Sequence, residues 1–296
     1  TMALTSASCD CSTLQSESLP VFYSERLLAD AESPSPSAHK PREVIASWLR
    51  LGIKLQLLAP PPVSRRQLAL AHAPDYVDAV LSGQADNGFG NRLPGVARAL
   101  PHVVGAVYAA AQHVLVTRRV ALAPVGPFHL AGYRSAAADC TFNALLVTAL
   151  ALKQAGQVQR VGIIDASLQP ADGSQDILQR LQQGSWLKHA ALSVQGEALA
   201  AAGFTALEQL VLDMADCDLL LYQASVDGHW LDVNEGWLDE NQLLQRDRLL
   251  CASAAEWCLP LVVITGAGHQ RDDLGKLEPV LRLHDNTLRA CAEAFG

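Results

Sequence analysis

The sequence of 296 residues contains no cluster of basic side chains. Its longest basic runs are the pairs Arg65-Arg66 and Arg118-Arg119, and Asp and Glu outnumber Lys and Arg by 30 to 22, for a formal net charge of −8. Binding to nucleic-acid phosphates requires clustered Lys and Arg. We therefore expect no nucleic-acid partner.

Long apolar runs are absent as well. Stretches such as residues 261–264 are about four to six residues long, whereas a helix that spans a bilayer needs about 20. Residues 1–19 are rich in Ser and Thr and lack the basic start and apolar core of a signal peptide. We expect a flexible tail over residues 1–19, no membrane association and a cytoplasmic location.

A disulfide framework is not indicated either. The 7 cysteines are an odd number, and most lie in apolar or helical contexts, which is typical of reduced thiols in a cytoplasm. Cys9 and Cys11 are the only closely spaced pair, and no His or second Cys pair lies near them in the sequence. The pair fits a tail better than a metal site.

Short apolar runs alternate with helical patterns along the chain. Strands are predicted at residues 21–23, 55–58, 119–125, 160–165, 190–194, 217–222 and 261–265, and helices at 40–51, from 73, 100–116, 141–155, 174–183, 205–213 and 241–257. Buried runs of Leu and β-branched residues between helices indicate a parallel sheet covered on both faces. Because no repeat or linker divides the chain, we predict a single α/β domain over residues 20–296.

Ligands and catalytic groups in such folds gather in the loops beyond the carboxyl ends of the strands. In the loop after the predicted strand 119–125, residues 127–131 read Pro-Phe-His-Leu-Ala, and residues 139–143 at its end read Asp-Cys-Thr-Phe-Asn. They resemble the Gly-Phe-His-His-Ala and Phe-Cys-x-Phe-Asn motifs of the histone deacetylase-like family. The resemblance implies the arginase/deacetylase fold.

Further loops extend the resemblance over roughly residues 20–294, in the same order. Residues 163–174 lie where the family has Asp-x-Asp-x-His-His-Gly, and Tyr222–Asp227 resembles its Tyr-Gln-Ala-Gly-Ala-Asp motif. Residues 266–272 lie at the Gly-Gly-Tyr loop, and residues 87–92 match a loop common in bacterial members.

The family's activity implies a catalytic zinc held by two Asp side chains and one His. The corresponding positions are Ser167, Gln169 and Asp227. Zinc sites favour thiolate, imidazole and carboxylate ligands, so a hydroxyl and an amide are poor replacements. We therefore expect no tightly bound zinc or other cofactor.

The resemblance also implies two adjacent histidines for proton transfer, each oriented by a carboxylate. His129 and its partner Asp165 are present, but the second His is Leu130, which leaves its carboxylate Asp172 without a partner. His269 replaces the Tyr that would bond the developing oxyanion. Pro170 and Gln195 replace further histidines of the family.

These residues also have structural interpretations. His129 and Asp165 fit a buried hydrogen-bonded pair, Asp172 a turn, and Asp227 a cap for the segment that follows it. Asp165 and Ser193 match family positions that help to bind a structural potassium ion, a site that can outlast the loss of catalysis.

A rebuilt metal centre is the sharper alternative. His129, Asp227, His229 and His269 lie in loops that we expect to converge, and they offer three imidazoles and a carboxylate.

Three functions follow from these observations. The first is a non-catalytic deacetylase-like protein that binds a small molecule or a protein partner. The second is an amide hydrolase for acetylated amines or acetyl-lysine, with a weak or rebuilt metal site. The third is a structural subunit that pairs with an intact homologue. Assembly as a homo-oligomer is compatible with the sequence as well.

Overall fold

Seven parallel strands form one sheet in a computed structural model, which describes residues 18–182, 184–192 and 205–296. The strand order is β2-β1-β3-β7-β6-β4-β5, and every neighbouring pair is parallel. The strands are β1 (Leu19–Phe22), β2 (Leu55–Leu58), β3 (Val120–Ala123), β4 (Val161–Asp165), β5 (Leu187–Ala191), β6 (Leu219–Gln223) and β7 (Leu261–Ile264).

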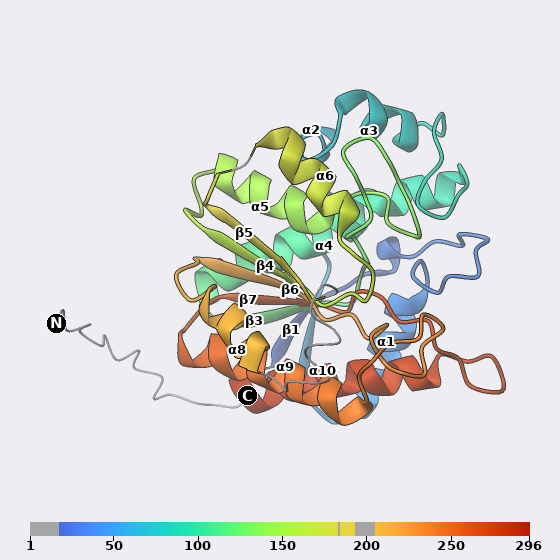
Figure 1. The fold of residues 1–296 in the computed structure, drawn as a ribbon. Helices are drawn as coiled ribbons and strands as arrows, with labels where there is room; N and C mark the ends of the chain where they lie inside the picture. Colours follow the sequence, from blue (N-terminus) through green and yellow to red (C-terminus); the bar gives the residue numbers. More distant parts are fainter. Residues whose placement is uncertain (1–17, 183, 193–204) are drawn as a thin grey trace.

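Helices cover both faces of this sheet, as Figure 1 shows. One face carries α2 (Arg65–Leu68), α3 (Pro74–Leu81), α4 (Pro94–Thr117), α5 (Ala144–Gln154) and α6 (Asp172–Leu181). The other carries α1 (Lys40–Arg50), α8 (Thr205–Leu212), α9 (Glu240–Glu256) and α10 (Glu278–Phe295). A 3-10 helix, η1 (Glu25–Leu27), follows β1. The predicted α/β architecture is confirmed.

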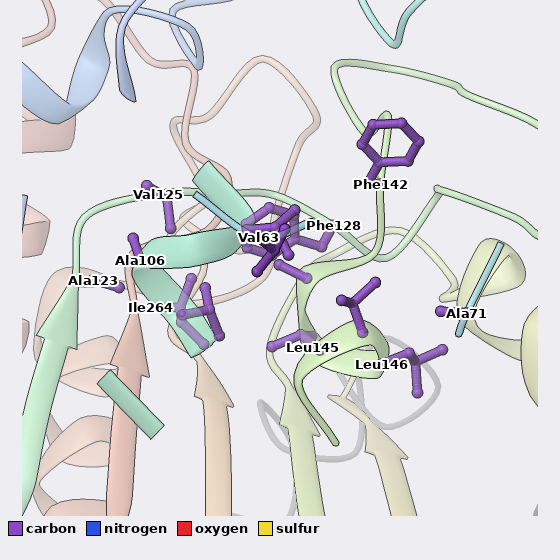
Figure 2. Close-up of a cluster of buried hydrophobic side chains, with 14 of the residues drawn as sticks. Val63, Ala71, Ala106, Ala123, Val125, Phe128, Phe142, Leu145, Leu146 and Ile264 are labelled. Atoms are coloured by element: carbon purple, nitrogen blue, oxygen red, sulfur yellow. The ribbon is translucent and has the colours of Figure 1, made fainter. Parts of the chain in front are cut away.

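Each face has its own hydrophobic cluster. Val104, Leu145 and Ile264 belong to the cluster beneath α4 and α5, part of which Figure 2 shows, and Trp48 and Leu250 belong to the opposite one. Burial of such side chains is the main favourable contribution to folding. The interior strands β3, β4, β6 and β7 are fully buried, which is why they read as continuous apolar runs.

Helix α4 is long and apolar enough, by length and composition, to cross a membrane. Half of that apolar window is buried inside the structure, where Val104, Val107 and Ala110 belong to the core cluster. A Cβ atom at Gly105 would lie 2.1 Å from the carbonyl oxygen of Pro61, so glycine permits this close packing. The composition of α4 is that of a core helix.

Several predicted boundaries are corrected. Strand β1 begins at Leu19, which the prediction had placed in the tail; residues 1–17 lie outside the described residues, so the rest of the tail stays a prediction. Strand β5 lies three residues before its predicted place, because its half-buried edge position gives no continuous apolar run. Helix α4 begins at Pro94, a residue suited to the first helical position. Helix α10 was not predicted.

Strands β4, β6 and β7 end at one level of the sheet. Asp165 pairs with Gln223, and Gln223 pairs with Ile264. Because these strands are parallel, the loops that follow them emerge side by side at the carboxyl edge. This register brings Ser167, Asp227 and the residues after Gly266 into one region.

Candidate functional site

Three neutral side chains from neighbouring strand ends, Ser167, Gln223 and Ser225, form the floor of the site, which we call the neutral network. Nε2 of Gln223 donates to Oγ of Ser167 at 2.8 Å, and the two serine hydroxyl oxygens lie 2.9 Å apart. The hydroxyl of Ser225 also accepts from the backbone N of Ala267. All three side chains are buried. The Ser167 hydroxyl is therefore engaged by protein partners.

The other two family ligand positions have different environments. Asp227 is buried, and its Oδ2 accepts from the backbone N of Leu168 at 3.2 Å, so the predicted cap of its own segment is wrong. Its Oδ1 has no hydrogen-bond partner among the described residues, and burial raises its pKa to about 7. Gln169, in contrast, is exposed.

His129 and Asp165 lie close together but are not directly hydrogen-bonded. Nε2 of Gln223 donates to Oδ1 of Asp165 at 2.8 Å and lies 3.5 Å from Nδ1 of His129. Burial lowers the pKa of His129 and outweighs the opposing effect of Asp165, which favours the neutral imidazole. The predicted pair is buried, as expected, but Gln223 separates its members.

The second family pair is absent. Leu130 cannot transfer a proton, and Asp172 is exposed as the first residue of α6 rather than part of an isolated turn. A carboxylate in the first turn of a helix interacts favourably with the helix dipole. Asp172 therefore has a structural role at this end of α6.

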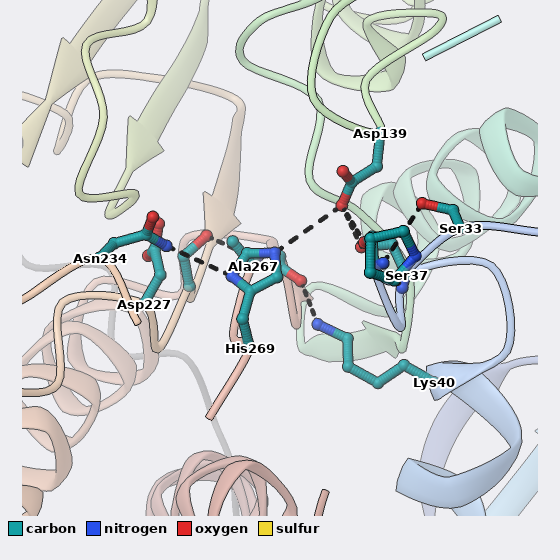
Figure 3. A network of polar contacts seen from close by, with 12 residues as sticks. Ser33, Ser37, Lys40, Asp139, Asp227, Asn234, Ala267 and His269 are labelled. Carbon is teal, nitrogen blue, oxygen red and sulfur yellow. Dashed lines mark hydrogen bonds and ion pairs between the residues drawn. The ribbon is translucent and has the colours of Figure 1, made fainter. Parts of the chain in front are cut away.

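Figure 3 shows a group of charged side chains, among them Lys40, Asp139 and His269, in the loops next to the sheet. We call Lys40, Asp139, Asp232 and His269 the charged cluster. Nε2 of His269 lies 3.8 Å from Oδ2 of Asp139, and its Nδ1 lies 3.9 Å from Oδ1 of Asp232. Burial alone would lower the pKa of His269, but the two carboxylates outweigh it and raise the pKa to about 9. His269 is thus an imidazolium ion at neutral pH.

Lys40 is the second cation of the cluster. It is fully buried, and its Nζ donates to the backbone oxygen of Gly266 at 2.6 Å. Burial lowers its pKa to about 8, against the opposing effect of Asp139, Asp227 and Asp232.

The predicted rebuilt metal centre does not assemble. Within residues 18–182, 184–192 and 205–296, no group of three His, Cys, Asp or Glu side chains is arranged to hold a metal ion. Nδ1 of His229 lies 3.2 Å from Oε1 of Gln270, whereas His269 belongs to the charged cluster. His129 and Asp227 make the separate contacts given above. The four residues serve different local networks.

Two further positions named from the sequence, Ser193 and Gln195, lie outside the described residues, so the potassium site remains a prediction.

The sequence motifs did not reveal the charged cluster as a unit. Asp139 carries the clearest signal, because a carboxylate stands where the resembling motif has Phe. Lys40 and Asp232 carry no such signal in the sequence, because only the folding of the loops brings them close to Asp139 and His269.

The comparisons with known proteins agree with this fold. A sequence model described as the histone deacetylase domain matches residues 36–187, more than half of the chain. The chain belongs to the histone deacetylase family. No curated protein matches its sequence. Among solved structures, the crystal structure of the HDA15 HD domain is similar, with a TM-score of 0.73 and 19% identity over 95% of this chain and 88% of that one. At this identity the likeness shows the fold.

The catalytic zinc of the histone deacetylase family does not fit the residues present. Ser167 bonds within the neutral network, Gln169 is exposed, and Asp227 alone offers a charged ligand. A zinc site requires three or four thiolate, imidazole or carboxylate ligands. No catalytic step through zinc follows from this arrangement.

Proposed function

We propose that this chain is a non-catalytic histone deacetylase-like protein that acts by binding a small molecule or a protein partner. The observation that supports this proposal is the state of the inherited ligand positions. Ser167 is held by Gln223 and Ser225, and Gln169 is exposed, so only Asp227 can act as a charged ligand. Amide hydrolysis in this family depends on a metal that polarises the carbonyl and activates water.

Loss of the proton-transfer group supports the same proposal. A positioned general base contributes about 10²–10⁴-fold to a rate. Leu130 occupies the position of the second family histidine and cannot carry a proton. The chain therefore lacks two separate contributions to hydrolysis.

One observation favours the alternative of an amide hydrolase. Nε2 of His129, Oδ2 of Asp165 and Oδ1 of Asp227 are buried polar atoms without a partner among the described residues. Such atoms are costly when unpaired and mark places that water, an ion or a ligand can occupy. Residual hydrolysis would have to use these atoms.

Hydrolysis of acetyl-lysine peptides separates the two functions. We expect no turnover above that of heat-killed protein, with or without added zinc. The matched variant Asp227→Asn removes the remaining charged ligand and should leave this background unchanged. Turnover by the parent that a chelator or Asp227→Asn abolishes would establish the hydrolase and refute the proposal.

A further inference from the structure

A small cavity lies next to the charged cluster. It has a volume of about 50 Å³ and lies between α4, the loop after β3 and the segment that leads into α1. Val96, Ala99 and Val103 of α4 face it, together with Val125 and Phe128. One water-sized position takes roughly 10–15 Å³, so the cavity has room for a ligand of about three to five non-hydrogen atoms. Its wall favours an alkyl group.

One end of the cavity is polar, and it presents hydrogen-bond acceptors. Asp139 and Ser37 line it. Oδ2 of Asp139 accepts from the hydroxyls of Ser35 at 2.6 Å and Ser37 at 2.5 Å. Because Ser37 donates its proton to Asp139, its oxygen presents lone pairs to the cavity. Within the described residues, the side-chain contacts of Asp139 all use Oδ2, so Oδ1 can accept a further hydrogen bond.

The backbone holds Asp139 firmly at this position. Its N donates to the backbone oxygen of Gly88 at 2.8 Å. A Cβ atom at Gly88 would lie 2.5 Å from the carbonyl carbon of Asp139, so glycine allows the two segments to touch. The carboxylate is therefore preorganised, which lowers the cost of binding a ligand.

The charge at this end selects the ligand's head group. Hydrogen bonds and the imidazolium of His269 outweigh burial and keep the pKa of Asp139 below its usual range, so Asp139 is anionic. Lys40 and His269 do not line the cavity, so no cation faces it among the described residues. A carboxylate on the ligand would be repelled by the carboxylate of Asp139, whereas an ammonium group would donate a charge-assisted hydrogen bond to it.

We propose that this cavity binds a small primary alkylammonium ion, with its ammonium group on Oδ1 of Asp139 and its alkyl chain against α4 and Phe128. The inference rests on the proposed binding function and names a ligand class for it. Because it requires no metal, it does not involve Ser167, Gln169 or Asp227.

Ligand-observed NMR titration of the whole chain tests this inference. The probes are n-butylammonium, n-butyrate and n-butanol at equal concentration and ionic strength, at pH 7. We expect saturable binding of n-butylammonium, at least tenfold weaker binding of n-butanol and no saturable binding of n-butyrate. Equal binding of all three probes, or no binding of n-butylammonium, would overturn the proposal.

Variants locate the binding. Asp139 has a φ of +66°, a conformation that Asn also tolerates, so Asp139→Asn should fold. We expect it to weaken n-butylammonium binding at least tenfold, whereas Asp273→Asn, which removes an exposed carboxylate, should change it less than twofold.

Ala99→Leu fills the cavity without altering charge and should abolish binding of the alkyl chain even if Asp139→Asn proves unstable. Binding unchanged by Ala99→Leu would place the ligand elsewhere. The hydrolysis assay tests a different claim. If the protein neither hydrolyses acetyl-lysine nor binds n-butylammonium, this inference is wrong but the proposed non-catalytic function is not contradicted.

Discussion

The neutral network and the charged cluster lie side by side, but their buried polar side chains are stabilised in different ways. Ser167, Gln223 and Ser225 carry no charge and satisfy one another by hydrogen bonds. In the charged cluster, His269 lies within 4 Å of both Asp139 and Asp232, with measured distances of 3.8 and 3.9 Å. An unpaired buried charge is costly, so a site can become neutral or acquire a counter-ion.

The two regions differ in the charge that their side chains carry. Of the two substituted ligand positions, Ser167 belongs to the neutral floor and Gln169 is exposed, and neither side chain carries a charge. At the charged cluster, Asp139 and His269 stand where the resembling motifs have Phe and Tyr, and they add a pair of opposite charges. The loops are tied together by protein groups in both regions.

Removing the central amide of the neutral network should have the largest effect on stability. Gln223→Leu leaves the Asp165 carboxyl, the Ser167 hydroxyl and the Phe128 N–H without the partner that each has now. Unsatisfied buried polar groups cost about 1–3 kcal/mol each, and we expect a total loss of about 3–5 kcal/mol. Urea denaturation measures this loss.

The surface substitution Gln175→Leu is the matched control, because Gln175 is exposed. It should change the free energy of unfolding by less than about 0.5 kcal/mol. If Gln223→Leu were equally harmless, the floor would not be held together by this amide.

The charged cluster should show its contribution as a pH dependence. The pKa of His269 is about 9 in the folded chain, against an ordinary value of 6.5. Because the folded value is the higher one, its stabilisation is fully present below pH 6.5 and is lost as the pH rises through about 9. At pH 6 we expect the free energy of unfolding of the parent to be about 2–3 kcal/mol higher than that of the His269→Gln variant.

Denaturation of both proteins from pH 6 to pH 10 measures that difference and cancels the titration of groups that they share. The gap should shrink steadily and close near pH 10. A gap that stays constant or widens would mean that the imidazolium does not contribute to stability.

Substitutions at the two family ligand positions Ser167 and Gln169 should change stability unequally, and both changes should be smaller than those above. Ser167→Ala removes hydrogen bonds to Gln223 and Ser225, at a cost of about 1 kcal/mol. Gln169→Ala should change stability by less than about 0.5 kcal/mol, because this side chain is exposed. Equal effects in parallel denaturation curves would show that Gln169 has a structural role.

The sequence predicted the parts of the fold that depend on local pattern. Buried strands such as β4 and β7 are continuous apolar runs, and their order along the chain predicted the parallel sheet. The edge strand β5 was misplaced because half-buried Lys188 and His189 interrupt its apolar pattern. Local pattern is weakest where a strand has only one covered side.

The sequence motifs indicated which loops lie close together but not which side chains pair. Ser167, Asp227 and His269 lie in neighbouring loops, as the motifs indicated. The insertion of Gln223 between His129 and Asp165, and the pairing of His269 with Asp139, depend on side-chain orientation. A sequence pattern does not carry that orientation, because it is decided when separate loops pack together.

Metal content tests the central claim most directly. The chain is purified without added zinc, next to its Asp227→Ala variant, and elemental analysis measures transition metal per chain. With Ser167 and Gln169 in two ligand positions, we predict far less than one zinc per chain in the parent and no change in the variant. About one zinc per parent chain, lost in Asp227→Ala, would contradict the account.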